Sequence, residues 1–105
     1  MKLLNENMGI DYFDILNLLK EKSIYRLSIK DYNGNMICDI SKFKIIKPTS
    51  SLIWFKGNQD DYKILLEKIN INTVIIDNIL ETGATVVTVI LKTKISYILF
   101  FSNKD

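Results

Sequence analysis

The dipeptide Asn33-Gly34 restricts the fold of this sequence more than any other feature. It lies between two runs in which apolar and polar residues alternate, and it tolerates the positive φ angles of a two-residue type I′ turn. A turn at this point fixes the register, so Leu27 should pair with Ile40. Residues 25–42 are therefore predicted to form an antiparallel hairpin with one apolar face and one polar face.

The predicted hairpin separates its side chains by polarity. Its core face is expected to hold Tyr25, Leu27, Ile29, Cys38, Ile40 and Lys42, of which only Lys42 is charged. Its opposite face is expected to hold Arg26, Ser28, Lys30, Ile37, Asp39 and Ser41. Beyond Ile40 the alternation changes parity, because Phe43 and Ile45 lie an odd number of residues further on. This change predicts a bulge or a strong bend near residues 41–42.

Two helices are predicted on either side of this region. The first should run from Tyr12 to Lys22, because Asp11 is a good N-cap and Asp14 falls at N3. The second should run from Gln59 or Asp60 to Ile69, because apolar residues recur there at helical spacing. These residues are Tyr62, Leu65, Leu66 and Ile69.

The remaining strand signals are runs rich in β-branched and aromatic residues. They cover Ser51–Lys56, Thr73–Leu80, Thr85–Leu91 and Ile95–Phe101. With the hairpin and the helices, the element order is α-βββ-α-βββ. No linker composition interrupts residues 1–105, and 105 residues is the usual size of one domain. The sequence thus predicts one α+β domain in which two amphipathic helices pack on a mainly antiparallel, twisted sheet.

The opening of the chain, from Asp11 to Gly57, resembles the start of an Sm-like small barrel. The shared features are a helix, a strand, the Asn33-Gly34 turn, a long bent strand and a third strand. The chain departs from that family, since it lacks the glycine of the bent strand and the Asp-x-x-x-Asn element that supports RNA binding. The resemblance implies a small barrel that binds nucleic acid.

The residue inventory excludes most catalytic chemistry. The chain has no histidine, which removes the usual general base and the commonest zinc ligand. Cys38 is its only cysteine and lies on the predicted core face, so it is interpreted as a small buried apolar residue. The adjacent carboxylates Asp60 and Asp61 are explained by a helix N-terminus. No catalytic residue, metal site or cofactor is predicted.

Positive charge is concentrated in the first half of the chain. From Lys20 to Lys56 there are eight basic and three acidic residues. A basic stripe near Tyr32 and Trp54 would suit single-stranded nucleic acid. Its candidate members are Arg26, Lys30, Lys42, Lys44, Lys47 and Lys56. The simpler interpretation is a solvated polar face with Trp54 in the core.

These observations favour a non-enzymatic binding protein. The leading hypothesis is a small inhibitor or adaptor of the phage or mobile-element type, acting on another protein such as a CRISPR component or a toxin. Its contact surface would comprise Arg26, Lys30, Tyr32 and Ile37, or Asp60 and Asp61.

A nucleic-acid-binding domain is the alternative function, and an enzyme using carboxylates alone is the third. Homo-oligomerisation through an uncovered strand edge, such as Ile95–Phe101, is compatible with each of them. The start of the chain lacks the apolar segment of a secretory signal, and no apolar run is long enough to cross a bilayer. A cytoplasmic location without membrane association is therefore expected.

Overall fold

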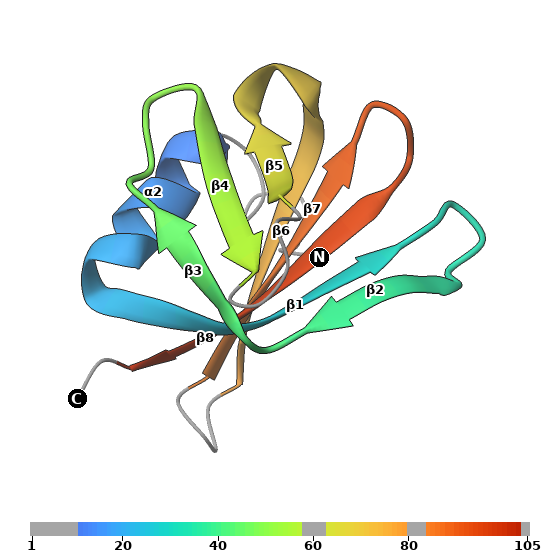
Figure 1. Cartoon of the computed structure of the whole chain (residues 1–105). Coiled ribbons are helices and arrows are strands. Elements are labelled where there is room, and N and C mark those ends of the chain that lie inside the picture. Colours follow the sequence, from blue (N-terminus) through green and yellow to red (C-terminus); the bar gives the residue numbers. More distant parts are fainter. Residues whose placement is uncertain (1–10, 58–62, 80–83, 104–105) are drawn as a thin grey trace.

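The computed structural model describes residues 11–57, 63–79 and 84–103. In these residues one α-helix is followed by eight strands and a single 3₁₀ turn (Figure 1). The elements are α2 (Tyr12–Glu21), β1 (Lys22–Lys30), β2 (Met36–Ile40), β3 (Phe43–Ile46), β4 (Leu52–Gly57), β5 (Lys63–Glu67), η1 (Lys68–Asn70), β6 (Ile71–Ile79), β7 (Ala84–Leu91) and β8 (Ser96–Asn103).

The strands form two antiparallel sheets. The larger, sheet A, has the order β2-β1-β8-β7-β6, and the smaller, sheet B, has the order β3-β4-β5. The predicted antiparallel character is confirmed, as are the three C-terminal strands. The predicted α-βββ-α-βββ order is wrong, because the described residues contain one α-helix and a strand where the second helix was expected.

The segment predicted as a second helix is strand β5 followed by η1. Leu66 is fully buried, whereas Leu65 is 42% exposed and Ile69 is 72% exposed, so these residues do not share one face. Ile64 and Leu66 point inward with the two-residue period of a strand, and β5 pairs with β4. Residues 58–62, which include Asp60 and Asp61, lie outside the described residues.

The N-terminal helix follows the prediction closely. The carboxylate of Asp11 accepts a hydrogen bond from the backbone N–H of Phe13 at 2.9 Å. The backbone N–H of Asp11 in turn donates to Oδ2 of Asp14 at 2.8 Å, which completes a capping box. The acidic residues at the N-cap and N3 positions had indicated both sides of this capping box.

The predicted hairpin register is confirmed for three pairs, Leu27 with Ile40, Ser28 with Asp39 and Ile29 with Cys38. The type I′ turn is wrong, because Gly34 has a φ of 86° whereas Asn33 has no positive φ.

Backbone hydrogen bonds from Gly34 to Asp31 and from Asp31 to Asn35 close a three-residue loop instead. A bulge at Ile37 restores the register beyond this longer loop, since Lys30 pairs with Met36.

Two irregularities change which residues face the core. Tyr25 is an extra residue in β1, because Ile24 pairs with Phe101 and Arg26 pairs with Phe100. The side chain of Tyr25 is therefore exposed, and its predicted place on the core face is wrong. The predicted bend at residues 41–42 is confirmed, and there the chain passes from sheet A to sheet B.

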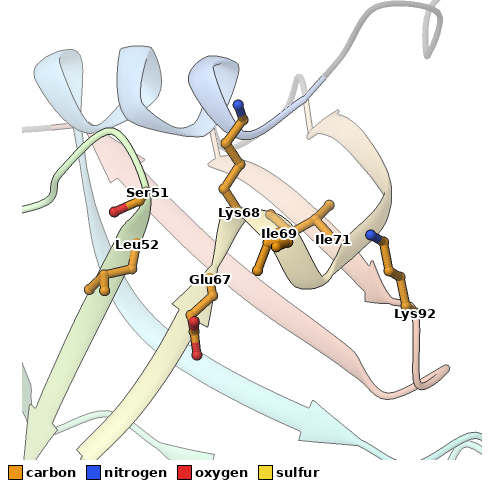
Figure 2. Close-up of a pocket in the computed structure, with 7 residues that line it drawn as sticks. All are labelled: Ser51, Leu52, Glu67, Lys68, Ile69, Ile71 and Lys92. Carbon is orange, nitrogen blue, oxygen red and sulfur yellow. The ribbon is translucent and has the colours of Figure 1, made fainter.

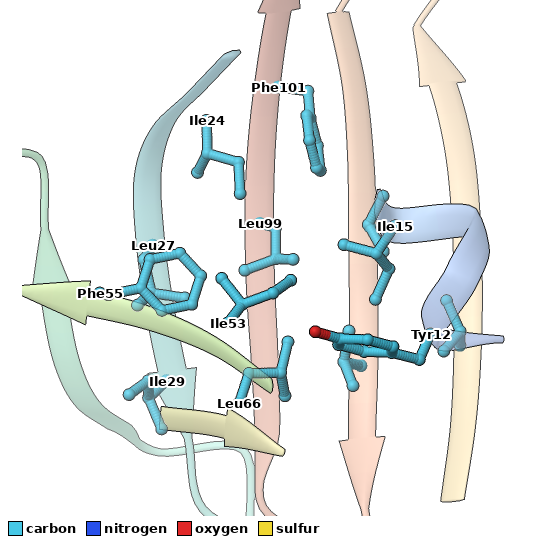
Figure 3. Close-up of a cluster of buried hydrophobic side chains, with 13 residues drawn as sticks. Tyr12, Ile15, Ile24, Leu27, Ile29, Ile53, Phe55, Leu66, Leu99 and Phe101 are labelled. Atoms are coloured by element: carbon cyan, nitrogen blue, oxygen red, sulfur yellow. The ribbon is translucent and has the colours of Figure 1, made fainter. Parts of the chain in front are cut away.

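One hydrophobic core lies between the two sheets and the helix. Figure 3 shows side chains from α2, β1, β4, β5 and β8 meeting there. The fully buried members include Ile15, Leu27, Ile53, Phe55, Leu66 and Leu99. Cys38 packs against this cluster, as predicted, but it is only partly buried and not fully so. The described ranges therefore bury a single core, to which both sheets contribute.

The segment proposed as an uncovered edge is internal. Strand β8 lies between β1 and β7, so Ile95–Phe101 offers no free edge and that prediction is wrong. The edges of sheet A are β2 and β6. Across the described ranges, no helix combines the length and the apolar character needed to span a bilayer.

Tyr12→Phe is expected to lower the free energy of unfolding by about 1 kcal/mol at pH 8. The buried phenol donates to the carbonyl oxygen of Thr49 at 2.6 Å, and phenylalanine leaves that carbonyl unpaired.

Burial also raises the pKa of Tyr12 from 10.0 to about 12. The neutral phenol therefore makes its full contribution to the free energy of unfolding below pH 10. This contribution is lost as the pH rises from 10 toward 12. Urea unfolding at pH 8 and pH 11.5 should show wild type more stable than the variant at pH 8 and no longer more stable at pH 11.5. A gap that stays constant would contradict this role for Tyr12.

Candidate functional site

The outer face of sheet B carries three lysines in one row. Lys44 pairs with Lys56 across β3 and β4, and Lys56 pairs with Lys63 across β4 and β5. Their neighbours Ile45, Phe55 and Ile64 point into the core, so alternation turns all three lysines outward. All three are exposed. With strands about 4.8 Å apart, this lysine row spans about 10 Å.

A second row on the same face is apolar and lies beside the lysine row. It comprises Ile46, Trp54 and Leu65, which are paired in that order. Trp54 and Ile46 are half-buried. The ammonium of Lys63 lies 4.9 Å from the centre of the Trp54 ring, and the indole N–H is buried without a hydrogen-bond partner. This apolar row thus presents an aromatic ring next to three cations.

Among the described residues, the lysine row places like charges opposite one another, which destabilises the fold when no ligand is bound. Like charges directly opposite one another in a sheet repel, and the central Lys56 has such a neighbour on both sides. Within the described part of the chain, neither Lys44 nor Lys56 has an ion pair or a hydrogen bond from its side chain. An anionic ligand would remove this repulsion.

The predicted basic stripe is divided between different parts of the molecule. Arg26 and Lys30 lie on the outer face of sheet A, whereas Lys44 and Lys56 lie on sheet B. Arg26 donates to the carboxylate of Asp39 at 2.8 and 2.7 Å, and its guanidinium lies over the Phe100 ring. These hydrogen bonds lower the pKa of Asp39 and leave Arg26 less available to another anion.

The other candidate residues lie elsewhere. Lys42 is exposed at the bend between the sheets, and Lys47 is exposed just after β3. Tyr32 and Ile37 lie in the β1–β2 hairpin, which extends away from α2 in Figure 1. Asp60 and Asp61 fall outside the described residues, so their predicted role has no structural counterpart here.

Sequence reasoning missed Lys63 because it placed this residue on a helix. An alternating pattern was nevertheless present, since Lys63, Leu65 and Glu67 alternate with Ile64 and Leu66. Five residues of such alternation are compatible with a strand as well as with a helix. Only the pairing of β5 with β4 brings Lys63 next to Lys56.

The site has the chemistry of an anion-binding surface. In the ranges that the structure describes, no three residues of the types His, Cys, Asp and Glu gather in a way that could hold a metal ion. Comparison with known proteins adds no family: no family model matches the chain, and no curated protein or solved structure is significantly similar to it.

Proposed function

We propose that this chain is a non-enzymatic binding protein whose lysine row takes the phosphates of a single-stranded nucleic acid. The observation that carries the proposal is the alignment of Lys44, Lys56 and Lys63 across three strands, where the described residues supply no counter-charge to Lys44 or Lys56. Such an arrangement is unfavourable for a free protein and favourable for a polyanion-bound one, because counterions are released when phosphates bind.

Trp54 favours a single-stranded nucleic acid over a duplex as the ligand. Unpaired bases expose flat π-faces that stack on aromatic rings, and each such contact is worth about 1–3 kcal/mol. In the free protein the ammonium of Lys63 lies over the ring of Trp54. When Lys63 turns toward a phosphate, the ring becomes available to a base. A duplex keeps its base faces stacked and would gain only the phosphate contacts.

Titration with oligothymidylate of 12 nucleotides tests this function. Trp54 is the only tryptophan, so its fluorescence should be quenched as the strand binds. Three phosphate contacts predict a slope of about −2 for log affinity against log salt, or roughly 20-fold weaker binding at 200 mM than at 50 mM. A duplex of the same length should bind more weakly. Absence of binding to the single strand at 50 mM salt would contradict the proposal.

A protein partner is a second candidate, because three large apolar side chains are exposed on the β1–β2 hairpin. Tyr32 is 73% exposed, Ile37 58% and Met36 51%. Tyrosine and methionine are enriched in protein interfaces. Ile37 lies at the bulge of β2, which is the terminal strand of sheet A among the described residues. This surface corresponds to the inhibitor or adaptor hypothesis.

The two candidates differ in which variant abolishes binding. A stoichiometric protein complex purified with the chain should persist after nuclease treatment and be lost on Ile37→Asp if the hairpin is the contact. If nuclease removes the co-purified material and Ile37→Asp leaves it unaffected, the nucleic-acid function is favoured. Ile37 is exposed, so this substitution should leave the fold intact.

A further inference from the structure

A pocket of about 550 Å³ lies where the start of β4 and the end of β5 meet the start of β6 (Figure 2). It is lined by Ser51, Leu52, Glu67, Lys68, Ile69, Ile71 and Lys92. Two backbone hydrogen bonds fix its walls, one from Lys68 to the carbonyl of Ser51 and one from Lys92 to the carbonyl of Asn70, both at 2.8 Å. The pocket is thus held open by main-chain contacts and has the size of small-ligand sites.

The lining combines an apolar wall with the cation of Lys92, whereas the ammonium of Lys68 lies 4.8 Å from the centre of the Phe13 ring. Ile69 and Ile71 lie between Lys68 and Lys92 in Figure 2. Ile69 is 72% exposed, which is unusual for an isoleucine beside a pocket and leaves its apolar surface in water. A ligand that suits this pocket has a flat apolar part to cover Ile69 and an anionic group to meet Lys92. A nucleotide has both parts.

The pocket is continuous with the lysine row. Leu52 and Glu67 form a pair in sheet B, two residues along the strands from the pair of Trp54 and Leu65. Lys56 lies four residues from Leu52, which is about 13 Å along an extended strand. The outer face therefore leads from three cations, across an aromatic ring, into the pocket.

Glu67 shapes this path. It pairs with Leu52 where the outer face of sheet B meets the pocket, and its negative charge disfavours a phosphate at that position. A strand lying along the face would place a base there and its next phosphate beyond it, toward Lys92. The arrangement of charges thus spaces the phosphate contacts.

We infer that this pocket receives a further nucleotide of the strand held by the lysine row, with the base against Ile69 and Leu52 and the phosphate at Lys92. The inference rests on the proposed function and extends it. The pocket makes the binding site longer than the sheet face alone. Affinity should accordingly depend on the length of the oligonucleotide.

The double variant Ile69→Ser/Lys92→Glu tests this inference. Both side chains are exposed, so the fold should be retained. Wild type is expected to bind oligothymidylate of 12 nucleotides more tightly than that of 4 nucleotides, as measured by Trp54 fluorescence. The variant should lose roughly 10-fold in affinity for the 12-mer, from one phosphate contact and one base contact, and little for the 4-mer.

The matched control is Lys94→Glu, which reverses a lysine in the same turn but outside the pocket. This control should leave both affinities close to wild type. Equal loss for both lengths, or no loss for either, would overturn the inference while the proposed function stands. If neither oligonucleotide quenches Trp54 in wild type, the proposed function fails and the inference fails with it.

Discussion

Phe55→Ala is expected to lower the free energy of unfolding by about 3–5 kcal/mol, which is a large part of the total stability of a domain this size. Phe55 has no exposed surface, and its ring packs edge-to-face on Phe43 at 5.6 Å between centroids. It belongs to the central strand of sheet B and points toward sheet A. Alanine at this position leaves a cavity between the two sheets.

Urea denaturation measures this effect, and two further substitutions bracket it. Phe55→Leu keeps most of the volume and should cost less than about 2 kcal/mol, so it remains measurable if the alanine variant does not fold. Phe13→Ala removes an exposed phenylalanine that contacts Lys68 and should cost about 1 kcal/mol. If Phe55→Ala costs no more than Phe13→Ala, the placement of the core between the sheets is wrong.

Reversing the lysine row is expected to reduce affinity for single-stranded nucleic acid on the order of 100-fold or more at 0.1 M salt. The variant carries Lys44→Glu, Lys56→Glu and Lys63→Glu, which remove three phosphate contacts and add three repulsive charges. Its stability should fall by no more than about 1 kcal/mol, because one set of like charges replaces another while the contact of Lys63 with the Trp54 ring is lost. Fluorescence anisotropy of a labelled 12-nucleotide strand measures the affinity.

The matched control reverses Lys20, Lys30 and Lys94, which changes the net charge equally but lies away from the lysine row. The control should lose much less affinity, since only the overall field is altered. Equal losses in the two triple variants would show that binding follows net charge and not the row.

The single variant Lys56→Glu separates binding from folding. A carboxylate between Lys44 and Lys63 replaces two repulsions with two attractions, so the free energy of unfolding should rise by about 0.5 kcal/mol. The same substitution should weaken nucleic-acid binding about fivefold or more. A variant that becomes more stable and binds less well is the behaviour expected of a residue retained for a ligand. A loss of stability instead would contradict the repulsion.

Local sequence signals were reliable where the interacting residues are close in the chain. Asp11 and Asp14 predicted the start of the helix because a capping box involves four successive residues. The pairing of Leu27 with Ile40 followed from the alternation on both sides of Gly34. The details of the loop were not predictable in this way, because a three-residue loop with a bulge gives the same register as a two-residue turn.

The residues of a short amphipathic segment did not by themselves decide whether it forms a helix or a strand. Leu65, Leu66 and Ile69 fit a helical face, and Ile64 and Leu66 fit a strand face. The choice depends on β4, whose backbone groups and buried Ile53 and Phe55 take up β5 as the third strand of sheet B. Because this segment was predicted as a helix, Lys63 was not included in the predicted candidate site.

The sequence by itself determined the helix start, the hairpin register, the three C-terminal strands and the absence of histidine chemistry, because each depends on neighbouring residues or on composition. The tertiary structure alone decided the split into two sheets, the internal position of β8 and the lysine row. These features arise from pairing between strands far apart in the chain. The free energy of such pairing depends on both strands together, so the periodicity of one strand alone does not reveal it.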